Sequence, residues 1–156
     1  MTLKSIDVLQ AVFRRKVEMW LNDVKAECAS AVGALSGLEL VIIETLRPYE
    51  RQAALYAQGR TAPGEIVTNA APGRSYHQFG LALDVGIKPA GGKFSWAWDK
   101  DPDLMAGMRR VAELASKRGI RWGGNFKSIV DLPHFEDGSA PSLAECNRLW
   151  PRGFKP

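Results

Sequence analysis

The sequence predicts an α+β fold, in which a small, mainly antiparallel sheet is packed by helices. Segments with helical and strand-like character follow one another in the order helix, strand, helix, strand, helix, strand. The length of 156 residues is that of one ordinary domain. The apolar content of 46% and the charged content of 24% are typical of a soluble globular protein. We therefore expect residues 1–156 to form a single domain.

The first segment has the pattern of an amphipathic helix followed by a buried strand. From Ile6, apolar residues recur at three- and four-residue steps, which predicts a helix to about Val32. Gly33 and Gly37 end it. Residues 38–45 are apolar and rich in β-branched residues, which predicts a buried strand. The helical stripe consists of Leu9, Phe13, Val17, Trp20, Val24 and Cys28.

A second helix is predicted from Tyr49 to about Gln58. Pro48 precedes it with a backbone already suited to a helix start, and Gly59 closes it. Residues 61–74 contain two prolines and two glycines and show no periodicity, which predicts a loop.

The segment from Gly73 to Asp84 reads G-R-S-Y-H-Q-F-G-L-A-L-D and contains His77. Asp84 lies within an apolar run, where a charged group is costly to bury unless it is paired or binds a metal. His77 and Asp84 are seven positions apart, which would place them on opposite faces of a regular strand. Gly80 permits the bend that would bring them together.

The remaining segments complete the predicted order. Residues 91–98 are expected to form a loop or a short strand. Asp101 and the proline after it predict a helix start, and Arg118-Gly119 a helix end. Residues 120–131 predict a turn between short strands, and a last helix runs from Ser142 to about residue 150.

Four residues in two segments have the composition of a catalytic zinc site. The chain has only two histidines, His77 and His134. Together with Asp84 they could supply three ligands and leave one position open for water. Asp131 is close enough to His134 in sequence to transfer the water's proton.

Each of these residues also has a structural interpretation. A single histidine is often only a hydrogen-bonded structural residue. Asp84 could be a buried cap paired with an arginine, and Asp131 a turn residue. The coincidence of all four groups favours the zinc site.

Three motifs carry a resemblance to a known family. They are S-x-H-x-x-G-x-A-x-D at residues 75–84, W-G-G at 122–124 and D-x-P-H-F at 131–135. An arginine-bearing segment at residues 46–60 is also similar to that family. From about Thr45 to Glu136 the chain resembles the VanX/VanY-type zinc peptidases, most closely the L-alanyl-D-glutamate endopeptidases used as phage endolysins.

The resemblance implies a hedgehog-type zinc peptidase fold and a set of site residues. It implies that His77, Asp84 and His134 hold Zn2+ and that Asp131 is the general base and acid. An aspartate rather than a glutamate at that position resembles the endolysin branch, and Glu136 is the rival base.

The resemblance also implies roles at the substrate. Arg47 would steady the carbonyl oxygen as charge develops on it, whereas the structural alternative is a surface ion pair. Ser75 would contact substrate, the alternative being a loop hydroxyl bonded to the backbone. Gln52 and Tyr56 share a helix face and are further pocket candidates.

The implied function is hydrolysis of an amide bond in a peptidoglycan stem peptide, namely L-Ala–D-Glu. The alternatives are a D-Ala–D-Ala carboxypeptidase or dipeptidase, and a non-catalytic cell-wall-binding domain of the same fold. The catalytic domain would occupy the whole chain, with no separate cell-wall-binding domain.

Charge and composition bear on partners and location. The net charge of +4 is mildly basic and arises from scattered residues, and two cysteines make no disulfide framework. No stretch would span a membrane, and residues 1–7 lack the layout of a signal peptide. We expect a monomer without nucleic-acid or stable membrane partners, made in the host cytoplasm, that acts on the wall after the membrane is permeabilised.

Overall fold

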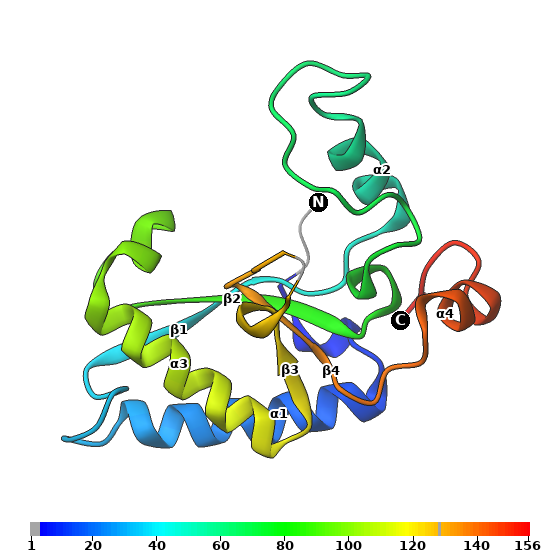
Figure 1. The fold of residues 1–156 in the computed structure, drawn as a ribbon. Coiled ribbons are helices and arrows are strands. Elements are labelled where there is room, and N and C mark those ends of the chain that lie inside the picture. The colour runs from blue at the N-terminus through cyan, green and yellow to red at the C-terminus, as the bar shows by residue number, and fades with distance from the viewer. Residues whose placement is uncertain (1–3, 128) are drawn as a thin grey trace.

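A four-stranded antiparallel sheet lies at the centre of the computed structural model, which describes residues 4–127 and 129–156 (Figure 1). The strand order is β1-β2-β4-β3, and each neighbouring pair is antiparallel. The strands are β1 (Leu38–Glu44), β2 (Ala82–Pro89), β3 (Ile120–Trp122) and β4 (His134–Asp137). The predicted α+β fold with a small antiparallel sheet is confirmed.

Two long helices, α1 (Ala11–Cys28) and α3 (Pro102–Lys117), cover one face of this sheet (Figure 1). The indole of Trp20 on α1 lies 4.8 Å from the ring of Phe135 on β4, measured between ring centroids, and donates through Nε1 to the carbonyl of Val111 on α3. One side chain thus contacts both the sheet and the second long helix. The core includes Phe13, Val17, Trp20, Val24, Leu83, Val85, Ile87, Met108, Val111 and Phe135.

The predicted first helix is shorter than expected at both ends. The 3-10 turn η1 (Ile6–Val8), which Ser5 caps, precedes α1, and the chain is extended at Leu9 and Gln10. The side chain of Gln10 donates to the carbonyl of Phe79 at 2.7 Å, a long-range contact that the helical pattern does not reveal. At the other end the apolar stripe stops at Cys28.

Two other predictions also need correction. Residues 96–100 form the 3-10 helix η3 (Trp96–Lys100), rather than a loop or strand, because the Ser95 hydroxyl accepts from the Ala97 amide and caps it. Of the described residues within 120–131, which leave out residue 128, only those of β3 form a strand. The strand that pairs with it, β4, begins at His134, after Pro133.

The two smaller helices lie outside the layer formed by α1 and α3 (Figure 1). α2 (Tyr49–Ala57) and the loop after it rise above the sheet, and α4 (Leu143–Leu149) lies beside it (Figure 1). The predicted α2, α3 and α4 are confirmed within a residue or two at their ends. None of the helices in the described ranges combines the length and apolar character that crossing a bilayer would require.

Candidate metal centre

The alternation of side chains along the strands separates the candidate site from the core. Asp84 on β2 is paired in register with His134 on β4, so their side chains share one face. Leu83 and Phe135, their neighbours in the chain, form the next pair and are fully buried on the opposite face. Asp84 and His134 therefore point away from α1 and α3.

His77 reaches the same place from outside the sheet. It lies on the 3-10 turn η2 (Tyr76–Phe79), which ends at Gly80. The backbone of Gly80 has a φ of 63°, in the left-handed region that favours glycine, and an added Cβ would lie 3.2 Å from the Gln10 nitrogen. The predicted bend between His77 and Asp84 is confirmed, and it occurs at this glycine.

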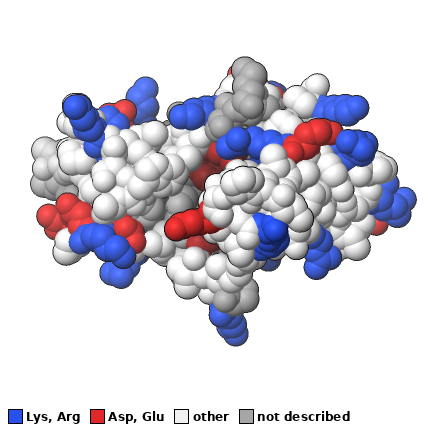
Figure 2. Space-filling model, turned by 90° about the horizontal axis from the view of Figure 1, so that it is seen from above, with Lys and Arg blue, Asp and Glu red and all other residues white. Residues whose placement is uncertain are grey.

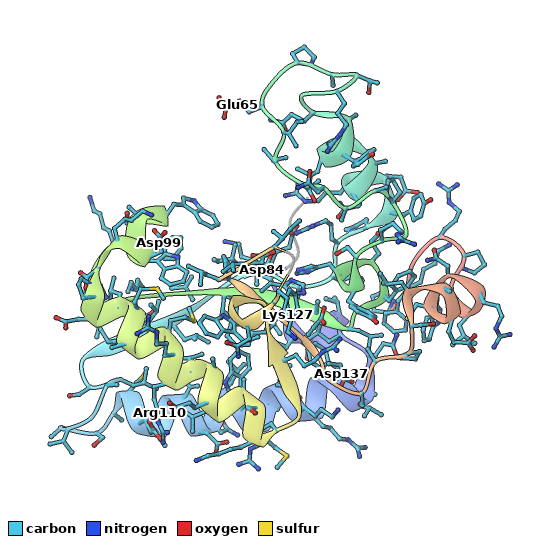
Figure 3. All side chains as sticks on the ribbon, viewed as in Figure 1. Glu65, Asp84, Asp99, Arg110, Lys127 and Asp137 are labelled. Atoms are coloured by element: carbon cyan, nitrogen blue, oxygen red, sulfur yellow. The ribbon has the colours of Figure 1, made fainter. Side chains whose placement is uncertain are left out.

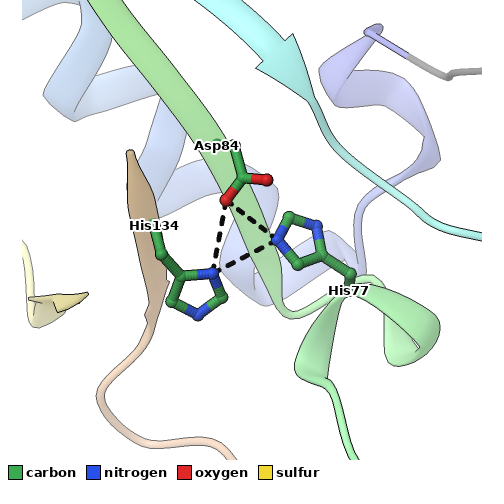
Figure 4. A group of neighbouring side chains, drawn as sticks. All are labelled: His77, Asp84 and His134. Atoms are coloured by element: carbon green, nitrogen blue, oxygen red, sulfur yellow. Dashed lines mark hydrogen bonds and ion pairs between the residues drawn. The ribbon is translucent and has the colours of Figure 1, made fainter. Parts of the chain in front are cut away.

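Three ligand atoms converge at this point (Figure 4). The His77 Nε2 lies 3.0 Å from the Asp84 Oδ1 and 3.2 Å from the His134 Nδ1. The His134 Nδ1 lies 3.3 Å from the same Asp84 oxygen. Two imidazole nitrogens and one carboxylate oxygen so close together could hold a metal ion.

The outer nitrogen of each histidine is bonded to an acceptor. The His77 Nδ1 donates to the carbonyl of Thr45 at 2.7 Å, and the His134 Nε2 donates to the Glu136 Oε2 at 3.1 Å. When a ring carries its only proton on this outer nitrogen, it turns a lone pair toward the other ring and toward Asp84. When both nitrogens of a ring are protonated, the inner one donates to Asp84 instead. Such outer bonds are a regular feature of histidines that bind metals.

The charges within this cluster stabilise one another. Burial alone would raise the pKa of Asp84, but the charge of His77 and the hydrogen bonds from both histidines hold it well below its usual range. Burial would lower the pKa of His134, but its bonds to Asp84 and Glu136 outweigh that effect and raise it to about 9. The site therefore favours a positive charge next to Asp84, which is what a cation would supply.

A β-bulge places a further carboxylate beside the cluster. The register of β1 shifts between Ile42 and Glu44, so that Glu44 pairs with Asp84. Glu44 is 5% exposed and accepts hydrogen bonds from Arg47 through Nε, at 2.7 Å, and through Nη2. Arg51 donates to its other oxygen at 2.9 Å.

Arg47 is thereby held at the edge of the cluster. Its Nη1 donates to the Gln52 Oε1 at 2.9 Å, and its Nη2 lies 3.5 Å from the Asp84 Oδ2. Its side chain is only 13% exposed, so it is not a surface ion pair of the kind that the sequence left open. The guanidinium has a fixed direction beside the three ligand atoms.

Gln52 and Tyr56 lie elsewhere than the sequence interpretation expected. The Gln52 side chain is fully buried, and its Nε2 donates to the carbonyl of Ala70 at 2.6 Å. The Tyr56 ring lies under the guanidinium of Arg60, at 4.1 Å. Neither side chain is among the residues that line the cleft described below, so the cleft's lining does not support their expected contact with substrate. Gln52 instead holds Arg47 in place.

An open cleft of about 600 Å³ lies over the cluster. Seen from above, acidic side chains lie in a hollow near the middle of this face, and basic side chains lie mostly around its margins (Figure 2). Asp84 lies in the sheet, on β2, whereas Glu65 lies on the loop after α2, above the sheet (Figure 3). The lining includes Arg47, Ile66, Val67, Arg74, Ser75, His77, Asp84, Phe126, Ile129, Asp131, His134 and Glu136.

Asp131 enters the cleft on the loop between β3 and β4. Its amide donates to the carbonyl of Gly123 at 3.1 Å, and a Cβ on Gly123 would lie 2.5 Å from the Asp131 carbonyl oxygen and 3.0 Å from the His134 Cβ. Only a residue without a side chain permits this approach, which explains the glycine after Trp122. Partial removal from water and the charge of Asp84 raise the pKa of Asp131, against the opposing charge of His134.

Glu136 is bonded away from the centre of the cluster. One oxygen accepts from the outer nitrogen of His134, and the other accepts from Arg121 Nη2 at 2.6 Å. Both oxygens already accept hydrogen bonds, and neither belongs to the three atoms that converge on the candidate metal position. This geometry disfavours the rival assignment of Glu136 as the base.

Two contributors were missed by sequence reasoning. Glu44 is a carboxylate at the end of an apolar strand, the same signal that drew attention to Asp84, and could have been found from it. Thr45 acts through its backbone carbonyl, for which the sequence carries no signal.

Comparisons with known proteins identify a family of peptidases. Residues 68–137 match the family model described as D-alanyl-D-alanine carboxypeptidase, of the M15 peptidases. The chain is 38% identical over 113 residues to the peptidoglycan L-alanyl-D-glutamate endopeptidase CwlK of Bacillus subtilis, covering 71% of this chain and 68% of that protein.

Two further proteins are similar in sequence or structure. The L-alanyl-D-glutamate peptidase of Listeria phage A118 is 34% identical over 102 residues, which are 65% of this chain but only 31% of the phage protein. The crystal structure of the L-Ala D-Glu endopeptidase ChiX of Serratia marcescens superposes with a TM-score of 0.51 at 26% identity, covering 87% of each chain.

Proposed function

The chain belongs to the M15 family of metallopeptidases, and on that premise we propose that it hydrolyses the L-Ala–D-Glu amide bond of peptidoglycan stem peptides with a zinc ion. The observation that carries the proposal is the convergence of His77, Asp84 and His134 at the base of an open cleft. The relatives named above, which act on this bond, support the choice of substrate.

The ligand set fits zinc in number and kind. Two imidazole nitrogens and one carboxylate oxygen are a usual three-ligand set of catalytic zinc sites. Thr45 and Glu136 orient the two rings from outside. Bound there, zinc would acidify a water molecule and polarise the scissile carbonyl.

Asp131 would transfer protons, and Arg47 would stabilise the negative charge that develops during the reaction. Asp131 lines the cleft and is outside the ligand cluster, so its carboxylate is free to take a proton from the attacking water and return it to the leaving amine. Its raised pKa makes the carboxylate a stronger base toward that water. Arg47, held by Glu44 and Gln52, directs fixed N–H groups at the carbonyl oxygen, where negative charge develops.

Ser75 completes the proposed set. It precedes the η2 turn, lines the cleft and makes no capping hydrogen bond to that turn with its side chain. Its hydroxyl is therefore available to a substrate group.

A D-Ala–D-Ala carboxypeptidase is the second candidate, because the matching family model is described by that activity. Mass spectrometry of peptidoglycan digested with the purified protein distinguishes the two. New D-Glu amino termini are the expected result, whereas release of D-Ala would assign the second function. Retained binding to the wall without any cleavage would contradict both.

A further inference from the structure

Arg74 is a cleft arginine to which the proposed mechanism gives no role. It is exposed, lines the same cleft as His77 and Asp131, and lies three positions before His77 in the chain. Among residues 4–127 and 129–156, its guanidinium has neither a hydrogen-bond partner nor an ion pair, whereas many of the other arginines are paired with carboxylates.

The backbone that carries Arg74 is firmly anchored. The amide of Gly73 donates to the buried Gln78 Oε1 at 2.8 Å, and Asn147 donates to the Gly73 carbonyl at 2.7 Å. A Cβ on Gly73, whose φ is 80°, would lie 2.6 Å from the Asn147 Oδ1. The amide of Arg74 donates to Ala71 at 3.0 Å. A cation without a protein partner is thus presented from a fixed turn at the cleft.

The charges of the cleft leave this cation available for an anionic ligand. Of the acidic residues that line the cleft, Asp84 would be offset by the proposed zinc and Glu136 is paired with Arg121, and neither is bonded to Arg74. Asp131 would repel an approaching carboxylate, so a carboxylate bound in the cleft needs a cation beside it. The second cleft arginine, Arg47, already donates to Glu44 and Gln52. Of the two arginines in the cleft, only Arg74 has its full donor set free to bind an anion.

The substrate of the proposed function carries such an anion. A D-glutamyl residue that continues the stem through its side-chain carboxyl keeps a free α-carboxylate directly beside the scissile nitrogen. We propose that Arg74 binds this α-carboxylate and makes the enzyme selective for stems in which it is free rather than converted to a carboxamide. This inference rests on the proposed function. Arginine suits the role because its planar fork can bind both carboxylate oxygens.

The test compares two synthetic stem peptides that differ only in an α-carboxylate or an α-carboxamide on the D-glutamyl residue. The zinc-loaded wild-type enzyme should cleave the carboxylate peptide with a kcat/KM about 10- to 100-fold higher, as expected for a charge-assisted hydrogen bond. In Arg74→Ala this ratio should fall to near one, chiefly through loss of activity on the carboxylate peptide. Arg74→Lys should keep part of the preference.

The control and the contrary outcomes separate this inference from the proposed function. Arg15→Ala removes one positive charge from an exposed position on α1, outside the cleft, and should leave the ratio unchanged. Equal cleavage of both peptides by the wild type, or an unchanged ratio in Arg74→Ala, would overturn the role of Arg74 alone. Cleavage of neither peptide at the L-Ala–D-Glu bond would overturn the proposed function and this inference with it.

Discussion

The two faces of the central sheet are built from alternate residues of the same strands, but one face forms the apolar core and the other forms the charged cleft. On β2 and β4, Leu83 and Phe135 enter a closely packed apolar core, while Asp84 and His134 enter the cleft. The core face buries apolar surface, which stabilises the fold. The cleft face gathers charged groups whose desolvation is offset only by their contacts with one another.

Because adjacent residues lie on opposite faces, the stability of the fold and the chemistry of the site can be changed separately by substitutions at adjacent positions. A change on the core face should reduce the free energy of unfolding, and a change on the cleft face should reduce metal binding or turnover.

Replacement of His134 should have the largest effect on function. His134→Ala removes one of three proposed ligands, so zinc content and peptidoglycan cleavage should be lost together. The variant should still fold, as circular dichroism can verify. Full zinc content in the purified variant, measured by elemental analysis, would show that the ligand assignment is wrong.

Replacement of Phe135, the next residue, should have the opposite profile. Phe135→Ala empties a fully buried position that contacts Trp20, and it should lower the free energy of unfolding by about 3–5 kcal/mol. Urea unfolding followed by tryptophan fluorescence measures this change. At urea concentrations below the unfolding transition, the folded variant should retain its zinc. Loss of zinc from the folded variant would show that the two faces are not independent.

Asp131 tests proton transfer without metal ligation. Asp131→Asn keeps the shape of the side chain but removes its basicity, so kcat should fall by about two orders of magnitude or more while zinc content is retained. Single-turnover and steady-state cleavage of a stem peptide provide the measurement. Near-normal turnover would remove Asp131 from the mechanism and reopen the assignment of Glu136.

Arg47 tests charge stabilisation on the cleft face. Arg47→Ala should lower kcat and kcat/KM together by about 10²-fold, since the contact is made in the transition state. Arg47→Lys should recover only part of the rate, because lysine lacks the planar fork that Glu44 and Gln52 hold. A fall in zinc content equal to the fall in rate would instead assign Arg47 to the integrity of the metal site.

Glu136 should have the smallest effect of the cleft residues. Glu136→Gln keeps an acceptor for His134 but removes the charge, and we expect zinc affinity to fall by about tenfold. Competition with a fluorescent zinc chelator measures the affinity. An unchanged zinc affinity would limit Glu136 to a role in packing. The matched control is Arg121→Ala, which removes the donor to the other Glu136 oxygen.

Much of the cleft face could be predicted from the sequence, because its residues differ in polarity or flexibility from their neighbours in the chain. Asp84 stands out as a charge within an apolar strand, and Gly80 marks the bend that the offset from His77 demands. The order of helices and strands followed from periodicity, and antiparallel pairing was inferred correctly.

The remaining features depend on contacts between distant segments, to which local patterns are insensitive. The bulge before Glu44 depends on pairing with β2, and the helix start at Ala11 depends on the contact of Gln10 with Phe79. Gln52 resembled a pocket residue on its helix face, but its partners Arg47 and Ala70 lie on other segments and bury it.

We propose that the cleft face of the sheet becomes a peptidase site when it binds one zinc ion. The most direct measurement is stepwise addition of zinc to chelator-treated protein while peptidoglycan cleavage is followed. Activity should rise from near zero and reach a plateau at about one zinc per chain. Full activity in metal-free protein, or no activity at any ratio of zinc to protein, would contradict the account.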